Sequence, residues 1–191
     1  MKFLSARLHR RGALLFFSMV FAGAACAETE VYKTIDWNDL MPDAWVKEMT
    51  KDMAAVSKLS YLQDSSDEAA KAMNNIRKKL DEAPIVKTQL NKKVRIPGYA
   101  VPLDAERSDK REFLLVPYFG ACIHTPPPPA NQILLVRPMP QSKIKKMPEA
   151  MDVLWVEGEL KEGRVNTSQG VSGYLLEAVS IAPYETKPAK R

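Results

Sequence analysis

The amino-acid sequence predicts an α+β protein in which N-terminal helices pack on a five-stranded, OB-like antiparallel β-barrel. Two observations support this fold class: two apolar stripes with helical spacing precede residue 91, and five short apolar runs follow it. A third observation, a removable leader, sets where the folded chain begins. We divide the chain into a signal peptide (1–27), a helical segment (28–90), an OB-like β domain (91–183) and a disordered basic tail (184–191).

The first 27 residues have the three zones of a secretory signal peptide. Four basic residues come first, an apolar run follows, and Ala25-Cys26-Ala27 gives the small-residue pattern that signal peptidase accepts. The apolar run is shorter than the about 20 residues that a membrane-spanning helix needs. We expect cleavage after Ala27, so that the mature protein begins at Glu28 and is periplasmic. The alternative is a lipoprotein anchored at Cys26, although Gly23 stands where a lipobox usually has an aliphatic residue.

The charge of the mature chain argues against a nucleic-acid partner. The full sequence has 28 basic and 23 acidic residues, and the leader holds four of the basic ones, which leaves 24 against 23. Nucleic-acid binding depends on a basic surface that displaces counterions. We therefore expect no nucleic acid among the partners.

Two helices are predicted before residue 91. Pro42 suits the first turn of the first helix, and the second begins at a capping box formed by Ser65 and Glu68 and ends before Pro84. Each helix carries an apolar stripe, which consists of Trp45, Met49, Met53 and Val56 in the first and Ala69, Met73, Ile76 and Leu80 in the second. Such stripes usually face a core, so we expect both to be buried by packing.

Five apolar runs, partly β-branched or aromatic, predict five strands in the second half of the chain. They cover residues 94–103, 112–119, 132–138, 153–160 and 173–181. Pro97 and Gly98 interrupt the first run, where a bulge or tight bend is expected. Five short strands suit a Greek-key barrel of the OB type, and an open antiparallel sheet would suit the same pattern.

The loop "FGACIHTPPPPANQ" (119–132) holds the single cysteine and the single histidine that remain after the leader is removed. Pro126, Pro127, Pro128 and Pro129 favour an extended polyproline II conformation. In an extended chain, residues two apart project to the same face. We therefore expect Cys122 and His124 to share a face of the molecule.

Three interpretations of this pair remain open. As metal ligands, Cys122 and His124 would suit zinc or copper, with Glu112, Asp104, solvent or a second chain completing the site, the last giving a metal-mediated homodimer. As a thiol enzyme, His124 would lower the pKa of Cys122, with Asn131 or Gln132 orienting the imidazole. In the third interpretation both residues are structural, and the four prolines form a docking loop.

The segments "VRIPGYAVPLD", "EFLLVPYFGACIHTPPPPANQI" and "VLWVEGEL", together with "IDWNDLMP" before them, resemble the motifs of the DUF3299 family of exported bacterial proteins. The resemblance runs from about Ile35 to Ile181. It implies a genetic context that includes a MacB-like envelope ABC transporter, other exported proteins and gene sets linked to zinc scarcity. We therefore expect a non-enzymatic accessory or binding protein that acts with such a transporter, linked to zinc or other metal homeostasis. The alternative is a metal- or thiol-dependent enzyme that uses Cys122 and His124.

Overall fold

The computed structural model describes residues 31–57, 67–103, 111–122, 127–142, 144 and 146–185. Several sequence predictions fall outside these ranges: those for the signal peptide and Cys26, for Ser65, Asp104, His124 and Pro126, and for the tail from residue 186 onward. Neither of the helices in the described part of the chain is long and apolar enough to cross a membrane.

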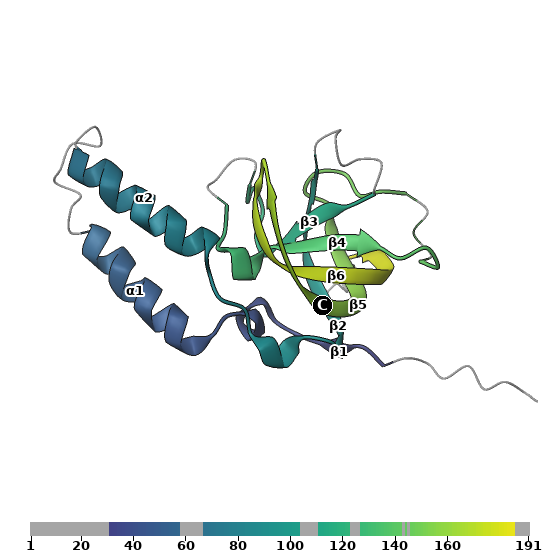
Figure 1. Ribbon diagram of the computed structural model, residues 1–191. Helices are drawn as coiled ribbons and strands as arrows, with labels where there is room; N and C mark the ends of the chain where they lie inside the picture. The colour runs from purple at the N-terminus through teal and green to yellow at the C-terminus, as the bar shows by residue number, and fades with distance from the viewer. Residues whose placement is uncertain are drawn as a thin grey trace, which may run out of the picture. The chain divides into compact units, whose positions relative to one another are not determined.

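The described part of the protein is a mixed α+β structure with two helices and one six-stranded sheet, which confirms the coarse fold class (Figure 1). The helices are α1 (Asp43–Ser57) and α2 (Asp67–Asp81), and the short 3-10 turns are η1 (Trp37–Leu40), η2 (Lys87–Gln89) and η3 (Ala130–Gln132). The strands are β1 (Lys33–Thr34), β2 (Lys93–Pro102), β3 (Phe113–Val116), β4 (Leu134–Pro138), β5 (Val153–Thr167) and β6 (Gly170–Pro183). Each of the five predicted runs overlaps one strand, and β1 was not predicted.

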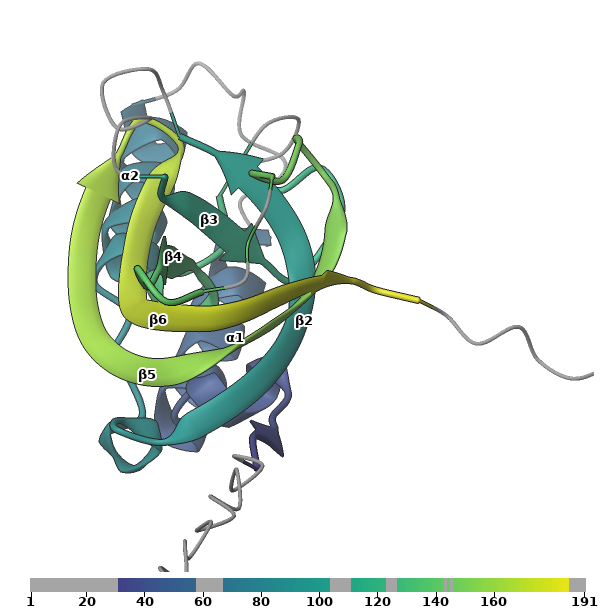
Figure 2. The ribbon, with the colours of Figure 1, turned by 90° about the vertical axis from the view of Figure 1, so that its right-hand side faces the viewer.

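The strand pairings form a closed ring. The order is β1-β2-β3-β4-β6-β5, and β2 also pairs with β5, an arrangement that Figure 2 shows from the end of the strands. The prediction of wholly antiparallel pairing is wrong for two pairs, because β4 runs parallel to β6 and β1 runs parallel to β2.

The bulge expected at Gly98 is absent from the pairing of β2 with β5, whose register is continuous there. Gly98 instead permits a close approach, since an added Cβ would lie 2.8 Å from Leu115 Cγ and 3.0 Å from the ring of Trp37. Trp37 in η1 donates a hydrogen bond from its indole nitrogen to the carbonyl oxygen of Pro97 at 2.8 Å. The glycine therefore lets the N-terminal segment pack directly on β2.

The hydrophobic core lies among the strands. Side chains alternate along each strand, and one buried cluster draws its larger members from β2, β3, β4, β5 and β6: Ile96, Phe113, Leu115, Leu134, Leu160, Tyr174 and Leu176. Strand β3 is buried along its whole length, because a second cluster covers its other face. That cluster includes Leu114, Val116, Ile133 and Leu135, with Cys122 packed against it. Ala121 and Cys122, which follow β3 in the chain, therefore help to cover this face of the sheet.

The apolar stripes of α1 and α2 are only partly buried, so the prediction that they face the core is wrong for Met53 and Met73. Met49 is the one buried residue in α1, and Ile76 is the one in α2. Met53 and Met73, from the same stripes, are 50% and 58% exposed. The helices contact one another, and Lys79 of α2 bridges to Glu48 and Asp52 of α1. The packing of the described helices on one another and on the strands therefore leaves part of each stripe exposed.

Candidate functional site

Cys122 lies in an apolar environment at a turn. Its φ angle of 66° is left-handed, so the extended backbone predicted around the pair is wrong at this residue. The side chain is half-buried against the outer cluster that includes Ile133. Across from it is Gly170, where an added Cβ would lie 3.1 Å from both Ile133 and Pro127 and 3.8 Å from Cys122 Sγ.

This burial changes the acidity of the thiol. Desolvation raises the pKa of Cys122 from an ordinary 9.0 to about 11, because a thiolate loses hydration that apolar neighbours do not replace. Reactive and metal-binding cysteines work as thiolates and occur in electropositive surroundings. The environment of Cys122 therefore favours a neutral, packed thiol.

The other predicted members of a metal or thiol site are not brought to Cys122 in the described structure. Glu112 is buried and forms an ion pair with Arg137, whose Nε lies 2.7 Å from Glu112 Oε1. His124 and Asp104 lie outside the described residues. Within the described ranges, no group of three or more His, Cys, Asp or Glu side chains could hold a metal ion.

Asn131 and Gln132 form part of η3, which follows the prolines. Asn131 is fully buried, and its Nδ2 donates a 2.9 Å hydrogen bond to the carbonyl oxygen of Pro84, just beyond α2. The backbone nitrogen of Gln132 donates to the carbonyl oxygen of Pro129 at 2.7 Å and closes the turn. Asn131 thus ties the proline segment to the chain that leaves the helices.

The described prolines form a stiff ridge beside the helices. Pro129 has φ −60° and ψ 152°, which is the polyproline II conformation expected from the sequence. Pro128 is buried, whereas Pro127 and Pro129 are half-buried. We call Pro127–Pro129 the proline ridge; Pro126 lies outside the described residues.

Two hollows flank the proline ridge and share Leu80 of α2. The larger, of about 380 Å³, is the methionine hollow, and Thr50 is its one polar lining residue beside Met41, Trp45, Val46, Met49, Met53, Leu80 and Pro129. The smaller, of about 240 Å³, is lined by Met73, Asn74, Ile76, Arg77, Leu80, Asp81 and Pro127. The exposed methionines of both helical stripes therefore line hollows beside the ridge. We call this surface, made by Trp45, Met49, Met53, Met73, Leu80, Pro127 and Pro129, the helix–proline face.

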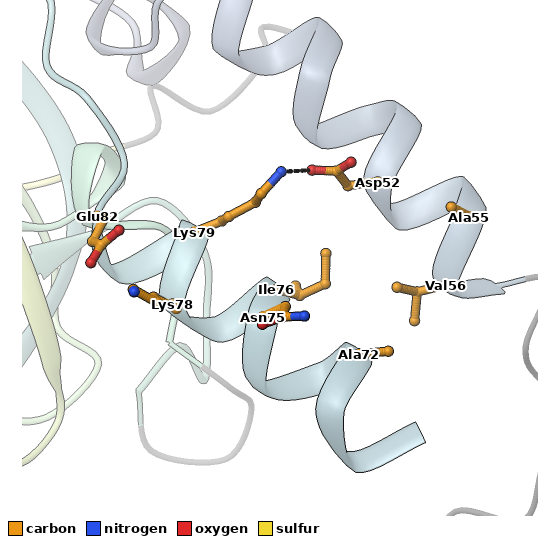
Figure 3. A pocket seen from close by; sticks show the side chains of 9 residues that line it. All are labelled: Asp52, Ala55, Val56, Ala72, Asn75, Ile76, Lys78, Lys79 and Glu82. Carbon is orange, nitrogen blue, oxygen red and sulfur yellow. Dashed lines mark hydrogen bonds and ion pairs between the residues drawn. The ribbon is translucent and has the colours of Figure 1, made fainter. Parts of the chain in front are cut away.

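A third hollow, of about 520 Å³, lies between the two helices and has a more polar character (Figure 3). Figure 3 shows Lys79 reaching from α2 to the carboxylate of Asp52 in α1, with Ile76 and Val56 facing the space between the helices. This ion pair joins the helices on a solvent-exposed side. Two of the residues that line this hollow, Asp52 and Lys79, are therefore already paired with one another in holding the helices together.

The sequence prediction identified the prolines of this surface but not its helical half. A signal was present, since Met49, Met53 and Met73 stand in two helical stripes, and methionine is frequent at adaptable binding surfaces. Helical spacing shows only that these side chains share one side of a helix. It does not show whether the chain itself covers that side.

Comparison with known families assigns the chain over almost all of its described length. The family model DUF3299, described as a protein of unknown function, matches residues 37–183. The chain belongs to the DUF3299 family. This match confirms the resemblance found in the sequence motifs, and it includes both helices and β2 to β6 of this DUF3299 protein.

One solved structure gives the same assignment. The crystal structure of a DUF3299 family protein from Pseudomonas aeruginosa PAO1, at 2.45 Å resolution, is 29% identical to this chain with a TM-score of 0.57. The similarity covers 83% of this chain and 99% of that one. Comparison with curated proteins finds no match.

Proposed function

We propose that this DUF3299 protein is an exported, periplasmic, non-enzymatic binding protein that acts as an accessory to an envelope ABC transporter. The observation that carries the binding role is the open helix–proline face. Met53 and Met73 are 50% and 58% exposed there, beside two apolar hollows that the described chain leaves unfilled. Contiguous exposed apolar surface of this kind marks interaction sites.

The partner segment that best fits this face is an amphipathic helix. A groove lined by methionines and bordered by prolines accepts a row of apolar side chains, and the flexible thioethers adapt to their shapes. Arg77 and Asp81 of α2 are the charged residues that line the smaller hollow, and Arg77 forms no ion pair with described residues. We therefore propose a partner helix that presents an acidic residue to Arg77 beside its apolar stripe.

A binding role is also supported by the state of Cys122. Its raised pKa and apolar surroundings disfavour the thiolate that a thiol enzyme needs. Zinc remains part of the proposal only as a bound ion shared between Cys122 and His124 of two chains, because two such ligands from each chain would complete a tetrahedral set.

The fold proposal goes further than the observed pairings. We propose that the closed ring of β2 to β6 is an OB-like barrel and that the helices pack at one side of it. The closed strand order, and a core cluster to which all five strands contribute, support the first statement. The second is supported by Leu80 of α2, which lines one hollow together with Pro127 and the other together with Pro129.

Export and the transporter rest on different observations. The three-zone leader supports export through a cleaved signal peptide. The resemblance to exported DUF3299 proteins supports an ABC transporter of the MacB type as partner, and metal homeostasis as the process.

The test is photo-crosslinking in living cells. A photoreactive amino acid replaces Met53 in one strain and Lys161, on β5, in another, and crosslinked products are identified by mass spectrometry. We expect position 53 to capture a component of the envelope transporter and position 161 to capture none. Exported protein that gives no crosslink from position 53 would contradict the proposal. Capture of a second copy of the chain would replace the transporter by self-association.

A further inference from the structure

Arg164, near the tip of the β5–β6 hairpin, reaches the end of α2. Its guanidinium donates to two backbone carbonyl oxygens, that of Asp81, the last residue of α2, and that of Ala83 at 3.0 Å. The residues are 83 and 81 positions apart in the chain, so this is a long-range contact. The terminal carbonyls of a helix lack partners within the helix and carry partial negative charge, so a guanidinium is suited to this place.

Two other side chains of the strand half hold the chain just after α2. Asn131 binds the carbonyl oxygen of Pro84. The hydroxyl of Tyr174 accepts a 2.6 Å hydrogen bond from the backbone nitrogen of Val86 and donates a 2.8 Å bond to the carbonyl oxygen of Leu40. Asn131 and Tyr174 therefore hold the segments that enter and leave the helical pair, whereas Arg164 acts on the last turn of α2 itself.

The last turn of α2 is also where the two hollows of the helix–proline face meet. Leu80 lines both hollows, and it immediately precedes Asp81, whose carbonyl Arg164 binds. A small rotation of α2 about its end would move Leu80 relative to Pro127 and Pro129. It would also move α1, since Lys79 joins the helices.

We propose that Arg164 is a positioning residue that sets the angle of the α1–α2 pair and thereby the shape of the helix–proline face. This inference rests on the proposed binding function, because the angle matters only if that face receives a partner. The planar guanidinium can donate to two carbonyls at once, whereas a lysine ammonium is a single compact charge. Two hydrogen bonds from one planar group therefore fix the orientation of the end of α2 more tightly than a lysine ammonium would.

Hydrogen–deuterium exchange of the mature protein tests the inference without a partner. The variants are Arg164→Ala, Arg164→Lys and, as a matched control on the same strand, Lys161→Ala, whose side chain contacts Asn91 and Glu159. For Arg164→Ala we expect amides in the last turn of α2 and also in α1 to exchange faster by about tenfold, since α1 moves with its partner helix. Amides of β4 should be unchanged, Arg164→Lys should be intermediate, and Lys161→Ala should match the parent protein.

The outcome in α1 separates positioning from simple helix capping. Faster exchange confined to the last turn of α2 would overturn the inference, as would an unchanged pattern in Arg164→Ala. Faster exchange in β4 as well would show that the whole fold is loosened, which also contradicts a positioning role. Because the measurement needs no partner, a negative result would overturn the role of Arg164 alone. The proposed function would still be tested separately by the crosslinking experiment.

Discussion

The strand ring and the helical pair of this protein carry apolar residues in equally regular patterns, yet the ring buries its apolar side chains and the helices leave some of theirs exposed. In the ring, residues such as Phe113, Leu160 and Tyr174 are fully buried by neighbouring strands. In the helices, Met53 and Met73 belong to equally regular stripes and remain at least half exposed. The comparison shows that the chain buries the apolar pattern of the ring but leaves part of the helical pattern exposed, on the surface that we propose receives a partner.

The largest expected effect comes from opening a cavity in the ring. Phe113→Ala should lower the free energy of unfolding by about 3–5 kcal/mol, because a large buried ring is lost and its space cannot collapse fully. Met53→Ala and Met73→Ala should each change it by less than about 1 kcal/mol, as expected for exposed side chains. Urea denaturation of the three variants measures the difference. Equal losses in the ring and the helices would contradict the comparison.

A charge placed on the helix–proline face should affect binding and leave folding intact. We expect Met53→Glu and Met73→Glu to reduce the recovery of the transporter component with the tagged protein by about tenfold, since a buried carboxylate would oppose an apolar partner. The matched control is Phe119→Glu. Phe119 is also an exposed apolar residue, at 65%, but it precedes Cys122 in the chain, whereas the proline ridge follows Cys122. If that control alone reduced recovery, the loop after β3 would be the binding surface instead.

Zinc tests whether the loop adds a second mode of association. If Cys122 and His124 of two chains share zinc, excess zinc should convert monomer to dimer, and His124→Ala should abolish the conversion. Dimerisation should weaken as pH falls, because protons compete for thiolate and imidazole. Sedimentation with metal analysis measures both. A protein that remains monomeric and metal-free in excess zinc would leave only the helix–proline face as a site.

The last expected effect is a pH dependence of stability that comes from Cys122 and is confined to alkaline pH. Its pKa is raised from 9.0 to about 11 in the folded protein, so the neutral thiol is favoured by folding. The stabilisation is complete below pH 9 and is lost as pH rises through about 11. The difference in stability between the parent protein and Cys122→Ser should change in this interval and be constant below it. Thermal unfolding at a series of pH values checks this, and a difference that changes below pH 8 would contradict it.

Much of the strand ring follows from the sequence alone. Strand side chains alternate between two faces, so runs such as 94–103 and 153–160 predict strands from their own residues. The residues at which the strands begin and end could not be predicted from the apolar runs. Strand β5 continues to Thr167 and β6 begins at Gly170 because the two pair with one another beyond the apolar runs. The two-residue strand β1 exists only through its pairing with β2, so it leaves no local pattern to find.

The sequence by itself determined the kinds of elements, the proline ridge and the family, because periodicity, proline stereochemistry and motifs are local properties of the chain. Only the tertiary structure decided which apolar faces are covered, since burial depends on segments that are distant in sequence. Met53 and Met49 share a stripe and differ in exposure for this reason. The left-handed turn and raised pKa of Cys122, and the contact of Arg164 with α2, likewise depend on neighbours that no short stretch of sequence specifies.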